Sequence, residues 1–82
     1  MLKIYGSMLC MDCVQCRQEL DAAGVAYEYL DFSEDLRNLK EFLTLRDTQS
    51  LFEPVREAGR IGIPCILRED GSVTLDWDEF LM

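Results

Sequence analysis

The N-terminal part of the chain alternates between strand and helix signals, and this alternation restricts the fold more than any other feature. Leu2–Tyr5 is a short β-prone run ending at Gly6, and Val25–Phe32 is a second run rich in aromatic residues. Between them, apolar or small residues recur along one helical face at Cys13, Cys16, Leu20 and Ala23, and Gly24 is expected to end the helix. This order predicts a βαβ unit with parallel strands and a right-handed crossover.

The middle of the chain predicts helices. Ser33 followed by acidic residues offers a cap for a helix over about residues 34–46, with leucines at helical spacing at positions 36, 39 and 43. Ser50–Glu53 fits a capping box for a second, short helix that ends at Ala58. Pro54 is tolerated near the start of that helix.

The C-terminal part predicts a hairpin and a last helix. Ile61–Leu67 is a buried strand with Pro64 near its beginning, Glu69–Ser72 is a turn, and Val73–Leu75 is a short return strand. Residues 76–82 suggest a terminal helix, in which Trp77 is a packing residue. The predicted architecture is a single α/β domain over residues 1–82 with the order β-α-β-α-(α)-β-β-α.

Composition excludes several classes of function. The chain has 16 acidic against 8 basic residues, a net charge of −8, and no basic stripe, so nucleic acid binding is disfavoured. No apolar run is long enough to span a bilayer. The first apolar run is interrupted by Lys3, so we expect no secretory leader and a cytoplasmic protein. Histidine is absent, so any catalysis must use the sulfurs.

Cys10 and Cys13 form a C-x-x-C pair that follows a strand and opens a helix. At a helix start, free N–H groups and the helix dipole stabilise a thiolate, and a cysteine one turn along is close enough for a disulfide. The expected chemistry is thiol–disulfide exchange, with Cys10 as nucleophile and Cys13 as the resolving thiol.

The chain resembles a glutaredoxin of the thioredoxin superfamily. The resemblance rests on Ile4-Tyr5-Gly6 leading to Cys10-Met11-Asp12-Cys13, and on Gly62-Ile63-Pro64 opening a later strand. It implies a thioredoxin-like fold with a central mixed four-stranded sheet flanked by helices. It also implies that Pro64 is cis beside the dithiol, and that the Ile63 backbone pairs with the substrate.

The resemblance further implies disulfide substrates, either in proteins or in low-molecular-weight compounds, and a reductant such as glutathione or a thioredoxin-type reductase. The chain departs from the glutaredoxin pattern at two glutathione-binding places. Ser7 or Met8 stands where a lysine is typical, and Val73–Asp78 holds no glycine pair. We therefore expect no tightly bound cofactor, and glutathione only as a possible co-substrate.

Met11 and Asp12 stand between the two cysteines, where glutaredoxins usually carry Pro-Tyr. A carboxylate there disfavours a thiolate, and no lysine offsets it. We expect Asp12 to tune the acidity of the dithiol and to make the pair more reducing. It is also a first-turn acid that favours the helix.

Cys16 and Cys65 leave a second interpretation open. Together with Cys10 and Cys13 they could supply four sulfurs to zinc or an iron–sulfur cluster, which would make the chain a metal-binding or carrier protein. Cys16 also fits a small core position, and we favour an inert Cys65 over a regulatory disulfide. A redox-inactive interaction module is a third interpretation. Arg37, Lys40 and Arg46 form a solvated helix face, or one of them binds a partner carboxylate.

Overall fold

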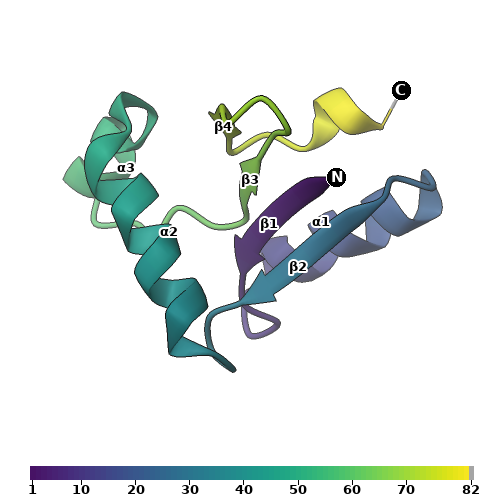
Figure 1. Ribbon diagram of the computed structural model, residues 1–82, viewed down its shortest axis with the longest axis horizontal. Coiled ribbons are helices and arrows are strands. Elements are labelled where there is room, and N and C mark those ends of the chain that lie inside the picture. Colours follow the sequence, from purple (N-terminus) through teal and green to yellow (C-terminus); the bar gives the residue numbers. More distant parts are fainter. Residues whose placement is uncertain (82) are drawn as a thin grey trace.

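Strand β1 (Leu2–Gly6) is an inner strand of a four-stranded sheet in the computed structural model, which describes residues 1–81 (Figure 1). It pairs in parallel with β2 (Tyr27–Asp31) and antiparallel with β3 (Cys65–Leu67). β3 pairs in turn with β4 (Val73–Thr74), which gives the order β2-β1-β3-β4. Helix α1 (Met11–Ala22) connects β1 to β2. The predicted parallel strand pair and the α/β fold with a mixed, helix-flanked sheet are confirmed.

Two apolar clusters cover the two faces of this sheet. Side chains alternate between faces along a strand, so Ile4 and Tyr5 of β1 belong to different clusters. The α1-side cluster consists of Ile4, Cys16, Leu20 and Ile66. The α2-side cluster consists of Tyr5, Phe42, Phe52 and Cys65. Fully burying a large apolar side chain contributes about 1.5–3 kcal/mol, so these clusters hold the helices on the sheet.

Helix α2 (Leu36–Thr48) begins later than the sequence predicted, and the prediction that Ser33 caps it is wrong. Asp35 is the N-cap residue, and its carboxylate accepts a hydrogen bond from the Arg37 backbone N–H at 2.9 Å. Ser33 is engaged elsewhere, because its backbone N–H donates to the Asp31 carboxylate at 2.8 Å in the turn that ends β2.

The predicted leucine stripe of α2 is also wrong in part. Leu36 and Leu43 are 76% and 40% exposed, whereas Phe42 is fully buried and Leu39 and Leu45 pack beside it. The Phe42 ring stacks on Phe32 at 5.5 Å and meets Phe52 edge-on at 6.1 Å, measured between ring centroids. Aromatic packing around Phe42 decides which face of the helix turns inward.

A 3₁₀ turn over Ser50–Phe52 and helix α3 (Glu53–Glu57) follow α2. The predicted capping box is wrong, since Ser50 lies inside the 3₁₀ turn and α3 begins without a side-chain cap. Pro54 lies in the first turn of α3, where its missing N–H costs nothing. Within residues 1–81, no helix has the length and apolar character that crossing a membrane requires.

Strand β3 is shorter than the predicted strand 61–67, because it begins at Cys65. Pro64 lacks a donor for the sheet, and the Ile63–Pro64 peptide bond is cis, as the resemblance implied. Gly62 has a positive φ of 92° and lies against Phe52 and Val55. Only glycine combines that backbone conformation with so close a neighbour.

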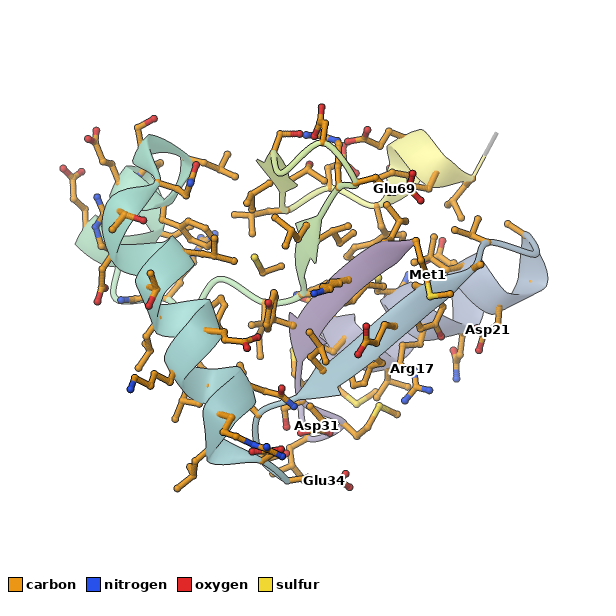
Figure 2. The ribbon with its side chains drawn as sticks, viewed as in Figure 1. Met1, Arg17, Asp21, Asp31, Glu34 and Glu69 are labelled. Atoms are coloured by element: carbon orange, nitrogen blue, oxygen red, sulfur yellow. The ribbon has the colours of Figure 1, made fainter. Side chains whose placement is uncertain are left out.

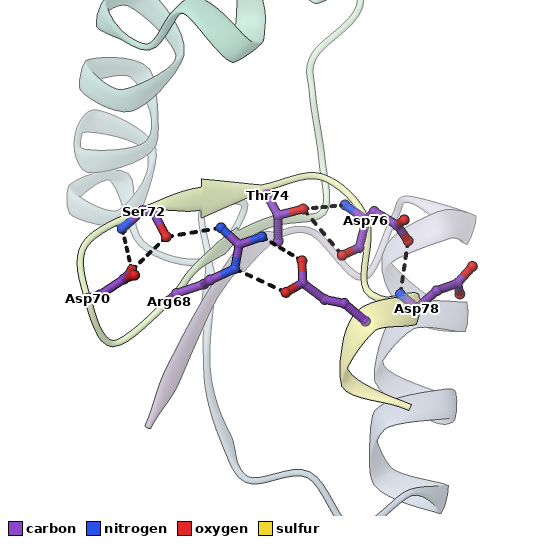
Figure 3. A network of polar contacts seen from close by, with 7 residues as sticks. Arg68, Asp70, Ser72, Thr74, Asp76 and Asp78 are labelled. Carbon is purple, nitrogen blue, oxygen red and sulfur yellow. Dashed lines mark hydrogen bonds and ion pairs between the residues drawn. The ribbon is translucent and has the colours of Figure 1, made fainter. Parts of the chain in front are cut away.

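The β3–β4 hairpin is tied to the C-terminal segment by one arginine (Figure 3). Arg68 donates to both carboxylate oxygens of Glu79, at 3.2 and 2.6 Å, and to the Ser72 hydroxyl at 3.0 Å. The predicted terminal helix is a single 3₁₀ turn over Asp78–Phe80, since the Asp76 carboxylate accepts from the Asp78 N–H in a local turn. Residue 82 of that prediction lies outside the described residues.

Trp77 packs against the α1-side cluster together with Phe80 and Leu81, which agrees with the packing role expected for it. Its indole N–H donates to the Glu19 carboxylate of α1 at 3.0 Å. The C-terminal segment therefore covers the same face of the sheet as α1.

Replacing Gly62 by alanine should destabilise the fold more than the same change at Gly71. Both glycines have a positive φ, of 92° and 88°. A β-carbon at Gly62 would lie 2.8 Å from Cε1 of Phe52, whereas at Gly71 it would meet nothing within 4 Å. We expect Gly71→Ala to cost about 1–2 kcal/mol for the backbone alone, and Gly62→Ala about 1–3 kcal/mol more for overpacking.

Urea unfolding of both variants and of the parent chain measures this difference. Equal losses of unfolding free energy at the two positions would contradict the packing argument.

Candidate dithiol site

Cys10 is the N-cap residue of α1. Its backbone is extended, with φ −99° and ψ 121°, and its carbonyl accepts the first helical hydrogen bond, from Val14 at 3.1 Å. The Cys10 N–H donates to the Ser7 carbonyl at 3.1 Å, which fixes the turn before the helix. The thiol makes no capping bond and is only half-buried. The structure thus places a reachable thiol at the start of a helix, where the sequence predicted it.

Cys13 lies one turn along α1 and is fully buried. Burial raises the pKa of its thiol to about 12. The neighbouring Cys10 adds to this rise, whereas the Ser7 N–H and the Tyr29 hydroxyl oppose it. Cys13 is therefore a protonated thiol at neutral pH, in contact with Cys10. All four cysteines are free thiols in this structure, and Cys10 alone among them is not buried.

A groove of about 740 Å³ opens beside Cys10. Cys10 and Asp12 line one side of it, and Ile63 and Pro64 belong to the loop that lines the other. Four of the five residues singled out from the sequence thus meet at one groove, and Cys13 lies behind Cys10. The C-x-x-C pair and the Gly-Ile-Pro segment are far apart in the chain, and the pairing of β1 with β3 brings them together.

Arg46 holds the loop that carries this second wall. Its Nε donates to the Ile61 carbonyl at 2.9 Å, and its Nη2 donates to the Arg60 carbonyl at 2.6 Å. Sequence reasoning placed Arg46 on a solvated face or against a partner carboxylate, and both interpretations missed this contact. Loop carbonyls have no signature in sequence that would reveal such a partner.

The other two basic residues of α2 fit the solvated face. Arg37 forms an exposed ion pair with Asp35 at 2.8 Å, next to the start of the helix. Lys40 is exposed. Neither residue lines the groove.

Cys16 and Cys65 lie in different clusters, on opposite faces of the sheet. Burial raises the pKa of both thiols to about 12. Cys65 follows Pro64 directly, but it belongs to the α2-side cluster and does not line the groove. In the part of the chain that the structure describes, no three cysteine, aspartate or glutamate side chains come close enough to hold a metal ion.

Exposed apolar side chains flank Cys10 in the chain and lie on the opposite loop of the groove, and sequence reasoning missed this apolar rim. The rim consists of Met8, Leu9, Met11 and Ile61, which are 44%, 88%, 78% and 58% exposed. Leu9 and Ile61 also line the groove. The signal was present in the sequence, because Met8, Leu9 and Met11 lie off the helical stripe that was assigned to the core.

Gly6 marks a second feature that the sequence did not reveal. A β-carbon at Gly6 would lie 2.8 Å from both the Cys13 Sγ and the Tyr29 Oη. These two atoms therefore converge on the end of β1, where only a glycine leaves room for both. Tyr29 was counted only as one of several aromatic residues in a strand.

Comparisons with known proteins add one relative. No protein-family model matches the chain, and no solved structure matches it. An uncharacterized protein of Haemophilus influenzae is 39% identical over 73 residues, which cover 89% of this chain and 85% of that protein. Identity at this level along most of both chains shows that the chain belongs to the same family as this Haemophilus influenzae protein.

Proposed function

We propose that the chain is a thiol–disulfide oxidoreductase with a thioredoxin-like fold of the glutaredoxin type. One observation carries the proposal. A half-buried cysteine is the N-cap residue of a helix, a buried cysteine lies one turn behind it, and the first of them lines a groove together with Ile63 and Pro64. Thiolates are stabilised at helix N-termini, and reactive cysteines are partly exposed there.

The two thiols have different roles in the proposed reaction. The Cys10 sulfur attacks a substrate disulfide, forms a mixed disulfide and releases one substrate thiol. The Cys13 sulfur then attacks the Cys10 sulfur, which forms the Cys10–Cys13 disulfide and releases the second substrate thiol. The substrate gains two electrons and two protons, and the dithiol loses them. Glutathione or a thioredoxin-type reductase would restore the dithiol.

The surface around Cys10 favours protein disulfides as substrates. Leu9 and Met11 precede and follow the nucleophile in the chain, and both expose large apolar side chains to solvent. Exposed apolar groups gathered at a groove are typical of sites that bind another polypeptide. In the superfamily that the chain resembles, the backbone at the position of Ile63 pairs with the substrate chain. The chain also lacks the lysine and the glycine pair that bind glutathione in glutaredoxins, which likewise favours protein disulfides as substrates.

Asp12 lines the groove beside Cys10 and is exposed. Its carboxylate repels anionic substrates as well as the anionic form of the nucleophile. We propose that this charge slows the first step of the reaction. Salt would weaken the effect, since exposed charges are screened.

Replacing each cysteine separately should divide the reaction into its steps. We expect Cys10→Ser to abolish disulfide reduction, because no other thiol reaches the groove. Cys13→Ser should keep the first step and accumulate a mixed disulfide, because the resolving thiol is gone. Insulin reduction coupled to a thioredoxin reductase, with mass spectrometry of the intact protein, measures both results.

Cys16→Ala is the matched control and should turn over like the parent chain. Loss of activity in that variant would contradict the two-cysteine assignment. So would zinc or an iron–sulfur absorbance in anaerobically purified protein that disappears with Cys16→Ala.

Removing the apolar rim should affect protein substrates selectively. We expect the double change Leu9→Ser and Met11→Ser to raise KM for insulin by roughly tenfold, because two apolar contacts are lost on docking. Turnover of a glutathione mixed disulfide should change little. Leu36→Ser is the control, since Leu36 is a leucine on α2 that is 76% exposed and does not belong to the rim. Equal losses for both substrates would contradict a polypeptide-binding rim.

Neutralising Asp12 should accelerate the first step. We expect Asp12→Asn to raise the rate of alkylation of Cys10 by neutral iodoacetamide by roughly twofold to fivefold in low salt, and less in high salt. Asp47→Asn, at an exposed position of α2, should leave the rate unchanged. An Asp12→Asn rate equal to that of the parent chain at low salt would contradict the tuning role.

A further inference from the structure

The Tyr29 hydroxyl is a buried polar group without a hydrogen-bond partner among the described residues. A buried hydroxyl that bonds to nothing costs free energy, because it has given up its bonds to water. Such a group in a folded protein requires an explanation, and proximity to a reacting atom is one that can be tested.

The Tyr29 hydroxyl and the Cys13 sulfur face the same point. Both the Oη and the Sγ would lie 2.8 Å from a β-carbon at Gly6, so the glycine opens the space that the two atoms share. The Tyr29 ring packs on the α1-side cluster, and the Arg17 guanidinium carbon lies 4.3 Å from the ring centroid. The ring is thus held on both sides, with its hydroxyl beside the resolving cysteine. Figure 2 shows Arg17 beside β2 and Asp31 at the end of this strand.

We propose that the Tyr29 hydroxyl donates a hydrogen bond to the Cys13 sulfur when that sulfur becomes an anion in the resolving step, a role that rests on the proposed dithiol function. In the resting protein the Cys13 sulfur is a neutral thiol and only a weak acceptor, which explains why the Tyr29 hydroxyl has no hydrogen-bond partner there. The bond forms when Cys13 gives up its proton. Tyr29 would then act on a reacting atom of the proposed mechanism.

The resolving step needs such a donor. Cys13 must lose its proton before it attacks the Cys10 sulfur, although burial raises the pKa of its thiol to about 12. In the step, the Cys13–Cys10 sulfur bond forms, the bond from Cys10 to the substrate sulfur breaks, and the substrate leaves as a thiolate. The proton from Cys13 ends on that thiolate or in water. A donor aimed at the Cys13 sulfur lowers the cost of the anion on this path.

Tyr29 remains a donor throughout this step. Burial raises the pKa of its hydroxyl well above the usual range, and the neighbouring Cys13 raises it further. Asp31 adds to the rise, and Arg17 opposes it. Around the Cys13 sulfur, the other groups are the Cys10 thiol from the start of α1 and the Ser7 backbone N–H. Tyr29 and Ser7 thus supply two donors to one sulfur.

Tyr29→Phe isolates the hydroxyl, because it keeps the ring that packs in the cluster. Deleting an unpartnered buried hydroxyl should not destabilise the fold. Tyr27→Phe is the matched control on the same strand: the Tyr27 hydroxyl donates to Asp21 at 2.7 Å, accepts from Arg17 at 3.3 Å and does not face Cys13. Urea unfolding of both variants checks that the fold is intact.

The probe is dithiobis-nitrobenzoate, an aromatic disulfide whose released thiolate is coloured. Reduced protein in stopped flow should release one thiolate when Cys10 attacks and a second when Cys13 resolves the mixed disulfide. Cys13→Ser should show only the first release. We expect Tyr29→Phe to leave the first release unchanged and to slow the second by roughly tenfold at neutral pH. This is the effect of losing one hydrogen bond to a sulfur that becomes negatively charged. Its pH–rate profile should move to higher pH, which a purely structural change would not cause.

The outcomes separate this inference from the function on which it rests. If the parent chain shows two releases and Tyr29→Phe matches it in both, Tyr29 has no role and the dithiol function stands. If Tyr29→Phe slows both releases, or if Tyr27→Phe slows the second equally, the hydroxyl does not act on Cys13 in particular. If the parent chain behaves like Cys13→Ser, the proposed dithiol function itself is wrong, and this inference falls with it.

Discussion

The pairing of β1 with strands on both sides is the constraint on which the rest of the structure depends. Its register with β3 sets Tyr5 opposite Cys65, so that Pro64 comes next to the end of β1 where the Cys10 loop begins. Its register with β2 sets Ile4 opposite Tyr29, which directs the tyrosine toward Gly6 and Cys13. A shift of one residue in either register would turn these side chains to the other face of the sheet. The backbone pairing of the sheet thus sets the relative positions of the residues that form the site.

Local patterns in the sequence were sufficient to predict the N-terminal β1–α1–β2 unit. The parallel pair of β1 and β2, the helix between them and the capping position of Cys10 follow from a β-prone run, a helical stripe and a second run in close succession. They were insufficient for α2. Leu36 and Leu43 had the right spacing for a core stripe, but the sheet selected the face centred on Phe42, and a stripe of leucines cannot show which aromatic ring lies opposite.

The same distinction applies to the site. Cys10, Cys13, Asp12, Ile63 and Pro64 carry motifs, and sequence reasoning found them. Tyr29 and Arg46 carry none, because their roles depend on strand register or on the carbonyl groups of a distant loop. Cys16 and Cys65 carry no such role. The metal-binding interpretation groups them with the other two cysteines, whereas the sheet separates them into opposite layers.

The bond between Trp77 and Glu19 gives the chain an internal optical reporter. Trp77 is the only tryptophan in the sequence, and its indole lies against the layer that also contains Cys16 and Leu20. Its fluorescence therefore comes from one known place and senses the hydration of one side of the sheet. The α2 side contains no tryptophan, so loosening of that layer would leave this emission unchanged. Tryptophan emission and far-ultraviolet dichroism, recorded together, would distinguish loss of one layer from loss of the whole fold.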